Sequence, residues 1–200
     1  MSDVLHRPSP PAQATVPGRH GDPGTEAPPA TAAPDEPSTV HRTFAFLDVC
    51  GFTKYTEQHG PFEAVRMLRT FRDLARVVAA RRGVRIAKWL GDGVMFVGVD
   101  AGPVAATAVE LTSRSEAEGI ALRGGVASGS CLLFEGDDYI GRCVNLASRL
   151  SDVAKGGEVL ADANTASLAP DWVRVGRPRS HRIQGFGRVH DITSLGTEPS

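Results

Sequence analysis

The sequence lacks a long apolar run and an excess of charge, and each absence excludes a class of protein. No stretch approaches the roughly 20 apolar residues of a membrane span, and the start has no basic flank followed by an apolar secretory core. A net charge of −1 gives no electrostatic attraction to nucleic acid or to an anionic membrane. We therefore expect partners of other kinds.

Cysteine is also scarce. The three cysteines, Cys50, Cys131 and Cys143, are odd in number and do not have the spacing of metal ligands. Reduced thiols are therefore expected rather than disulfides, which predicts a cytoplasmic location. The simplest interpretation of Cys50 is that it is a small buried hydrophobic residue.

Residues 1–40 contain no aromatic residue and few large aliphatic ones, but nine of the 14 prolines. Such a segment buries too little apolar surface to offset the entropy lost on ordering. We expect a disordered tail over residues 1–40 and one folded domain over residues 41–196. With 41% hydrophobic residues, the chain can form a sizeable core.

The domain has a mixed pattern of helices and strands. Pro61 begins, and Gly83 ends, a segment with apolar residues every three or four positions, which predicts an amphipathic helix. The other predicted elements are a strand over 44–47, a hairpin of strands 85–90 and 94–99, a helix over 103–117, a strand over 121–126 running into a turn at 128–130, a helix over 144–153, and short strands near 158–161, 172–175 and 189–193.

The order strand, helix, strand, strand, helix, strand is that of a ferredoxin-like βαββαβ core. The predicted fold class is therefore α+β, with an antiparallel sheet and helices on one face. The other face must be covered or solvated, and a homodimer would cover it.

Two aspartates lie where the chain is expected to turn. Asp48 ends the apolar run 44–47, which favours a strand. Asp92 lies in an Asp-Gly pair between two strand-like segments, a strong hairpin signal. If the hairpin pairs beside the first strand, the two carboxylates converge. Mg²⁺ usually takes one or two carboxylates and completes its shell with water and substrate phosphates, so a nucleotide is the expected ligand.

Lysine is rare, with three Lys against 19 Arg, and Lys88 lies inside this hairpin. A compact ammonium on a strand can donate to a ring nitrogen or carbonyl of a base, where a planar guanidinium would not fit. A solvated strand lysine is the alternative.

Three segments together resemble the class III adenylate and guanylate cyclase catalytic domain. They are Phe-Leu-Asp48-Val-Cys-Gly51-Phe-Thr, Lys88-Trp-Leu-Gly-Asp92-Gly and Asp138-Tyr-Ile-Gly-Arg-Cys-Val-Asn145-Leu-Ala-Ser-Arg149-Leu. Each segment alone is a weak signal, but all three in this order and spacing are highly specific. The resemblance covers about residues 42–195.

The resemblance implies a role for each of these positions. Asp48 and Asp92 would hold two Mg²⁺ or Mn²⁺ ions. The backbone amides of Gly51, Phe52 and Thr53 would bind the β- and γ-phosphates, since turn amides suit anions.

The remaining matched positions concern the base and the reacting centre. Lys88 and Asp138 match the pair that reads the base, and Asn145 and Arg149 match the pair that orients ribose and stabilises the transition state. Adenine offers an amino donor at N6 and an acceptor at N1, which Asp138 and Lys88 satisfy together, whereas guanine reverses both. The pair therefore implies ATP rather than GTP.

The resemblance thus implies an adenylate cyclase that converts ATP to 3′,5′-cyclic AMP and pyrophosphate. Family members form each site across a head-to-tail dimer, with metal aspartates from one chain and base-reading and transition-state residues from the other. This chain has both sets, so a homodimer is expected.

One segment departs from the family pattern. Many relatives carry a lysine near the C-terminus that contacts the triphosphate, but residues 183–188 here contain none. Arg182 or Arg188 could supply the charge, and slow turnover is one consequence. The segment between Ser130 and Asp138 is also short compared with many relatives, which could remove phosphate contacts.

Each candidate also has an ordinary structural explanation. Asp48 and Asp92 could serve as a strand-end cap and a turn residue, Asp138 could be an exposed loop acid, and Asn145 and Arg149 share one helix face at i and i+4 like many solvated pairs. The alternative function is a cyclase-like nucleotide-binding regulatory domain with weak or no turnover. A guanylate cyclase and a plain interaction domain are further options.

Overall fold

The computed structural model describes residues 38–197. Of the expected disordered tail, residues 1–37 lie outside this part. The first strand, β1 (Ser38–Val49), begins at Ser38.

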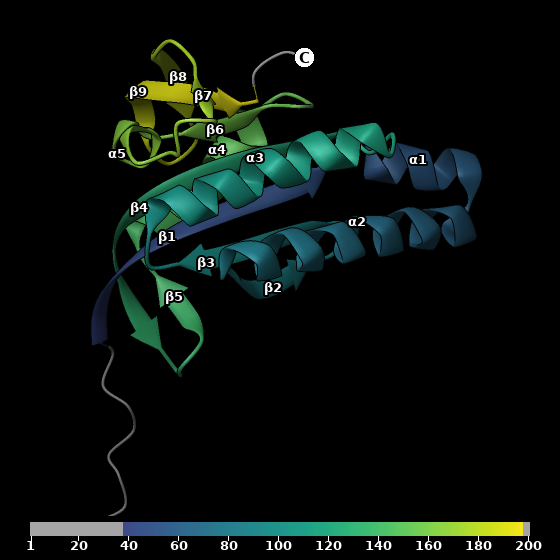
Figure 1. Cartoon of the computed structure of the whole chain (residues 1–200), viewed down its shortest axis with the longest axis horizontal. Coiled ribbons are helices and arrows are strands. Elements are labelled where there is room, and N and C mark those ends of the chain that lie inside the picture. The colour runs from purple at the N-terminus through teal and green to yellow at the C-terminus, as the bar shows by residue number, and fades with distance from the viewer. Residues whose placement is uncertain (1–37, 198–200) are drawn as a thin grey trace, which may run out of the picture. The chain divides into compact units, whose positions relative to one another are not determined.

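The sheet is built around β1 and is mostly antiparallel (Figure 1). Its strand order is β2-β3-β1-β4-β6-β9-β7, and only β4 and β6 pair in parallel. Two further strands attach to this path, β5 to β4 and β8 to β9. The strands after β1 are β2 (Arg85–Leu90), β3 (Gly93–Gly98), β4 (Leu122–Phe134), β5 (Asp138–Ile140), β6 (Val159–Ala161), β7 (Arg174–Val175), β8 (Arg179–Ile183) and β9 (Gly187–Gly196).

In the described part of the chain, five helices connect the strands. They are α1 (Phe52–His59), α2 (Pro61–Arg82), α3 (Ala101–Ala117), α4 (Arg142–Val153) and α5 (Ala163–Ser167). The order β1, α2, β2, β3, α3, β4 is the expected βαββαβ core, which confirms the predicted α+β fold. In this part of the chain, no helix is both long and apolar enough to cross a membrane.

The two faces of the sheet form two separate clusters, because successive side chains of a strand point to opposite faces. Ala45 and Leu47 of β1 pack with α2 and α3, which lie side by side in Figure 1. Phe44, which directly precedes Ala45 and therefore points to the opposite face, packs with the apolar face of α4. The helices of the core thus cover one face as predicted, and α4 is an additional helix on the other.

The turn predicted at residues 128–130 is wrong, because β4 continues as a strand to Phe134. β1 reaches back to Ser38 and offers β4 hydrogen-bonding partners as far as Leu133. Ser128 is satisfied inside the sheet, since its hydroxyl lies 2.8 Å from that of Thr43 and 2.9 Å from that of Thr165. Cys50, Cys131 and Cys143 are unpaired, the last two of them buried.

Candidate active site

Asp48 and Asp92 meet where β1 runs beside the β2–β3 hairpin. Asp48 pairs with Gly93 across the sheet, and the amide of Val49 donates to the Asp92 carbonyl at 3.3 Å. A Cβ on Gly93 would lie 2.9 Å from the Leu47 carbonyl oxygen and 3.3 Å from Oδ1 of Asp48. Only glycine therefore lets the hairpin approach the first aspartate so closely.

The two carboxylates interact electrostatically. Burial raises the pKa of Asp92, and the charge of Asp48 raises it further, against the opposing effects of a backbone hydrogen bond and Arg123. Within residues 38–197, no group of three or more His, Cys, Asp or Glu side chains is placed to hold a metal. Two hard carboxylates fit a divalent cation that takes its remaining ligands from water and substrate phosphates.

Arg123, which the sequence analysis did not single out, joins this pair from β4. Its Nη2 donates to Oδ2 of Asp48 at 3.0 Å, and its Nη1 donates to the Asp152 carbonyl at 3.2 Å. The hydrogen bond with Asp48 raises the pKa of Arg123, so the guanidinium stays protonated. The available signal was an arginine within an otherwise apolar strand.

The three residues expected to bind phosphates form the start of α1. Gly51 is the N-terminal cap, with a left-handed backbone (φ 70°), and Phe52 and Thr53 begin the helix. In the described part of the chain, no side chain caps this end and its first turn contains no acidic residue. The first amides of a helix have no partner within the helix and favour anions.

Lys88 and Asp138 are brought together from β2 and β5, although 50 residues separate them in the sequence. The ammonium of Lys88 donates to Oδ1 of Asp138. This hydrogen bond raises the pKa of Lys88 despite the opposing effect of burial. Both side chains are nearly half exposed, so they remain accessible to a ligand.

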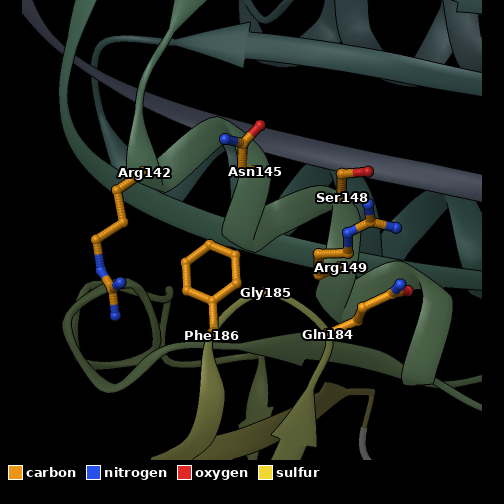
Figure 2. A pocket seen from close by; sticks show the side chains of 7 residues that line it. All are labelled: Arg142, Asn145, Ser148, Arg149, Gln184, Gly185 and Phe186. Carbon is orange, nitrogen blue, oxygen red and sulfur yellow. The ribbon is translucent and has the colours of Figure 1, made fainter.

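Asn145 and Arg149 line an open cavity of about 690 Å³ on α4 (Figure 2). Ser148 and Arg142 lie on the same helix, and residues Gln184, Gly185 and Phe186 form the opposite wall. Nη1 of Arg149 donates to Oδ2 of Asp152 at 2.9 Å. Both predicted side chains therefore face one shared space.

The wall opposite α4 is the turn between β8 and β9, the segment that lacks the lysine seen in many relatives. Besides Arg149, a second cation lines the cavity: Arg142, whose guanidinium lies 4.8 Å from the ring centre of Phe186. Arg182 and Arg188 pair with each other across β8 and β9 and do not line the cavity in the described structure. Arg142 was thus missed, although it directly follows Gly141 in the third motif.

The candidate residues fall into separate groups within one chain. Asp48 lines a smaller cavity of about 180 Å³ with Asp152 and Ser148, whereas Asn145 and Arg149 line the larger one. Among the described residues, neither cavity includes Lys88 or Asp138. Asp48 and Arg149 therefore line different cavities, which adjoin at Ser148.

Comparison with known proteins agrees with this geometry. Residues 36–175 match the family model of the adenylate and guanylate cyclase catalytic domain. An adenylate cyclase of Streptomyces griseus is 36% identical over 156 residues, covering 76% of this chain and 38% of that protein. An uncharacterized protein of Mycobacterium tuberculosis is 33% identical over 140 residues, covering 69% of this chain and 37% of its own length.

The fold is also similar to that of a solved cyclase. The crystal structure of the adenylyl cyclase CyaB from P. aeruginosa superposes with a TM-score of 0.72 at 26% identity, covering 82% of this chain and 97% of that chain. The chain spans only about 37% of the length of the mycobacterial relative. The match in sequence, fold and order of motifs shows that this chain belongs to the adenylate and guanylate cyclase catalytic domain family.

Proposed function

We propose that this chain is an adenylate cyclase, which converts ATP to 3′,5′-cyclic AMP and pyrophosphate. We choose ATP over GTP as the substrate because of the contact between Lys88 and Asp138. The naming of relatives such as the Streptomyces griseus protein as adenylate cyclases supports it.

The base-reading step follows from the donors and acceptors of this pair. The carboxylate of Asp138 accepts from the N6 amino group of adenine, and the ammonium of Lys88 donates to N1. Guanine would place its O6 acceptor against the Asp138 carboxylate, leaving two acceptors opposed. The existing contact keeps both side chains at the correct positions before the base arrives.

The phosphate end of the substrate meets the other half of the site. Asp48 and Asp92 would hold two Mg²⁺ or Mn²⁺ ions, which when bound lower the pKa of the ribose 3′-hydroxyl and neutralise phosphate charge. The first amides of α1 bind the β- and γ-phosphates. Arg123, already beside Asp48, adds a cation to this region.

Arg149 acts at the reacting centre. As the 3′-hydroxyl attacks the α-phosphorus and pyrophosphate leaves, the Arg149 guanidinium donates to the α-phosphate oxygens, where negative charge builds. It must first exchange its present partner, Asp152. Asn145, on the same helix face, orients the ribose.

We further propose that each complete site forms between two copies of the chain in a head-to-tail homodimer. Among the described residues, no cavity holds both Asp48 and Arg149, although their two cavities share Ser148, and this supports the arrangement. One chain would supply the metal carboxylates and the amides of α1. The other would supply Lys88, Asp138, Asn145 and Arg149.

The test is a product assay. Purified protein is incubated with ATP and Mn²⁺ or Mg²⁺, and cyclic AMP is measured by mass spectrometry, with GTP as the competing substrate. We expect metal-dependent cyclic AMP, far less cyclic GMP, and a loss of at least about a hundredfold in Asp48→Ala, the scale on which a metal ligand contributes to catalysis.

The result also separates the alternatives. Cyclic GMP in excess would identify a guanylate cyclase. Binding of a fluorescent ATP analogue that requires Mn²⁺, without any product at protein concentrations that give dimers, would instead support a nucleotide-binding regulatory domain.

A further inference from the structure

Arg72 on α2 contacts the hairpin that carries Asp92. Its Nη2 donates to the carbonyl of Gly91 at 3.2 Å, and its guanidinium lies 5.0 Å from the ring centre of Trp89. Gly91 immediately precedes Asp92, whereas Arg72 is 19 residues away in the sequence. We propose that Arg72 is a positioning residue that fixes the Asp92 turn for metal binding, an inference that rests on the proposed function.

The turn is fixed mainly through its backbone. Gly91 has a left-handed backbone (φ 68°), which reverses the chain ahead of Asp92. The Val49 amide holds the Asp92 carbonyl from β1, and Gly93 packs tightly against Leu47 and Asp48. Arg72 donates to the turn from α2, so both β1 and α2 form hydrogen bonds to the backbone of this turn.

The side chain of Arg72 is itself well defined. Trp89 packs beneath it, and the ring of Phe71 meets Trp89 edge to face at 6.3 Å between ring centres. The Nε of Arg72 is buried and has no hydrogen-bonding partner within the described residues. Leaving an N–H unpaired is unfavourable, and a freely solvated arginine would avoid it. The contacts with Gly91 and Trp89 therefore decide its position.

Arg76, one helical turn further along α2, offers a matched comparison. Its guanidinium also lies over Trp89, 5.5 Å from the ring centre, and it pairs with Asp73 at 2.8 Å. In the described structure it makes no hydrogen bond to the hairpin turn. The two arginines thus share the stacking contact and the charge, but only Arg72 holds Gly91.

The experiment compares Arg72→Leu, Arg72→Lys and Arg76→Leu with the wild-type protein. Mn²⁺ binding is titrated by electron paramagnetic resonance of free Mn²⁺ in the presence of an ATP analogue that cannot cyclise. Hydrogen exchange of the amides at residues 91–93 is measured without metal. Cyclic AMP assays then give the half-saturating Mn²⁺ concentration separately from kcat.

We expect Arg72→Leu to weaken Mn²⁺ binding about tenfold, the lower end of the range for groups that orient metal ligands. Its half-saturating Mn²⁺ concentration should rise by the same factor, and exchange at residues 91–93 should accelerate. Arg72→Lys, which keeps a donor, should recover part of the affinity. Arg76→Leu should stay within about twofold of wild type, since it removes the stacking on Trp89 and the exposed pair with Asp73 but no contact with the hairpin turn.

Equal effects in Arg72→Leu and Arg76→Leu, or none in Arg72→Leu, would overturn the inference. A wild-type protein that binds Mn²⁺ but forms no cyclic AMP would refute the proposed function alone, because a selective loss of Mn²⁺ binding in Arg72→Leu would still support the role of Arg72. An active wild type with unchanged metal binding in Arg72→Leu would refute the inference alone.

Discussion

At the scale of single residues, the proposed choice of nucleotide depends on two side chains that the fold brings into contact. Lys88 and Asp138 come from different strands, and their ion pair is largely solvated, so its contribution to stability is small. A contact of so little structural value is better explained by recognition, since it sets a donor and an acceptor side by side. That interpretation can be tested by removing the acceptor alone.

We expect Asp138→Ala to lower kcat/KM for ATP by about tenfold to a hundredfold, the range for losing a hydrogen bond to a charged group. Turnover of GTP should not fall, because the opposed acceptor is removed. Steady-state kinetics with both nucleotides measure the ratio. Asp137→Ala removes the same charge from the adjacent exposed position and should leave the ratio unchanged. Equal losses of kcat/KM for ATP in both variants would mean that the negative charge, and not a hydrogen bond from Asp138 to the base, explains the lower activity.

The sequence predicted the site residues that lie in recognisable motifs. It did not predict those that reach the site from neighbouring elements. Asp48 and Asp92 were expected to converge and do so, because Asp-Gly signals a hairpin and the hairpin pairs with β1. Arg123 could not be assigned, since its partner Asp48 lies 75 residues away and only sheet register brings them together. Arg142 was missed because its role depends on the turn at Phe186.

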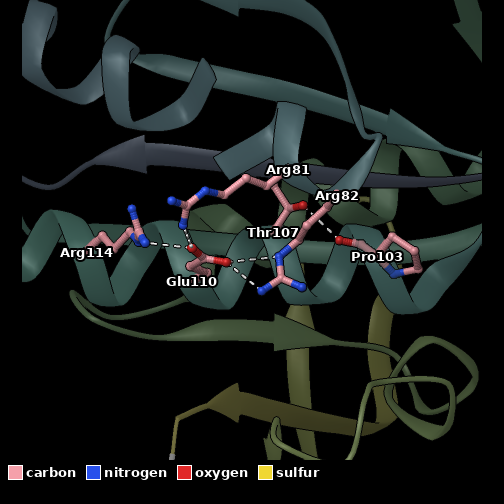
Figure 3. A network of polar contacts seen from close by, with 6 residues as sticks. All are labelled: Arg81, Arg82, Pro103, Thr107, Glu110 and Arg114. Atoms are coloured by element: carbon pink, nitrogen blue, oxygen red, sulfur yellow. Dashed lines mark hydrogen bonds and ion pairs between the residues drawn. The ribbon is translucent and has the colours of Figure 1, made fainter. Parts of the chain in front are cut away.

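At the scale of elements, α2 and α3 are joined by a polar network around Glu110 (Figure 3). Arg82 at the end of α2 donates to Oε2 of Glu110 through two nitrogens, at 2.5 and 3.0 Å, and Arg114 donates to Oε1 at 2.9 Å. Arg81 approaches Oε1 to 3.9 Å. The Glu110 side chain is only 18% exposed and that of Arg82 25%, so their ion pair is the partly buried centre of the network.

Glu110→Gln should destabilise the fold by about 2 kcal/mol, because partly buried arginines lose their counter-charge. For a domain of this size, that loss corresponds to a fall in Tm of roughly 4–8 °C. Thermal unfolding followed by circular dichroism, at fixed protein concentration, gives the value. Asp73→Asn breaks only the exposed pair with Arg76 and should change Tm by about 1 °C or less. Similar shifts in both variants would contradict the role given to Glu110.

The long helices and the short strands β6 and β7 followed from the sequence, whereas α1, α5, β5 and β8 were not predicted. The helix from Pro61 was readable because its apolar period is regular and proline and glycine mark its ends. In contrast, α1 spans only eight residues and buries none of them, so it is too short for an apolar period to identify it as a helix. The strand β4 was cut short in the prediction because glycine and serine at 128–130 favour turns locally, whereas pairing with β1 overrides that preference.

At the scale of the whole molecule, the distribution of site residues supports the proposed dimer, in which two copies together complete each site. The carboxylates of Asp48 and Asp92 lie on one part of the chain, and Asn145 and Arg149 face a different cavity. In the proposed dimer, each chain gives its metal carboxylates to one site and its α4 residues to the other. Two variants that are each inactive should then complement one another, provided that their defects lie in opposite halves.

Asp48→Ala and Arg149→Ala should each be inactive alone, and an equal mixture should recover about a quarter of wild-type activity. Random exchange makes about half of the dimers mixed, and each mixed dimer has one intact site and one doubly defective site. Cyclic AMP is measured after the chains have exchanged. Asp48→Ala mixed with Asp92→Ala is the matched control and should recover nothing, because both defects lie in the metal half and every site remains damaged. Recovery in that control, or no recovery with Arg149→Ala while sedimentation shows dimers, would rule out a site shared between two chains.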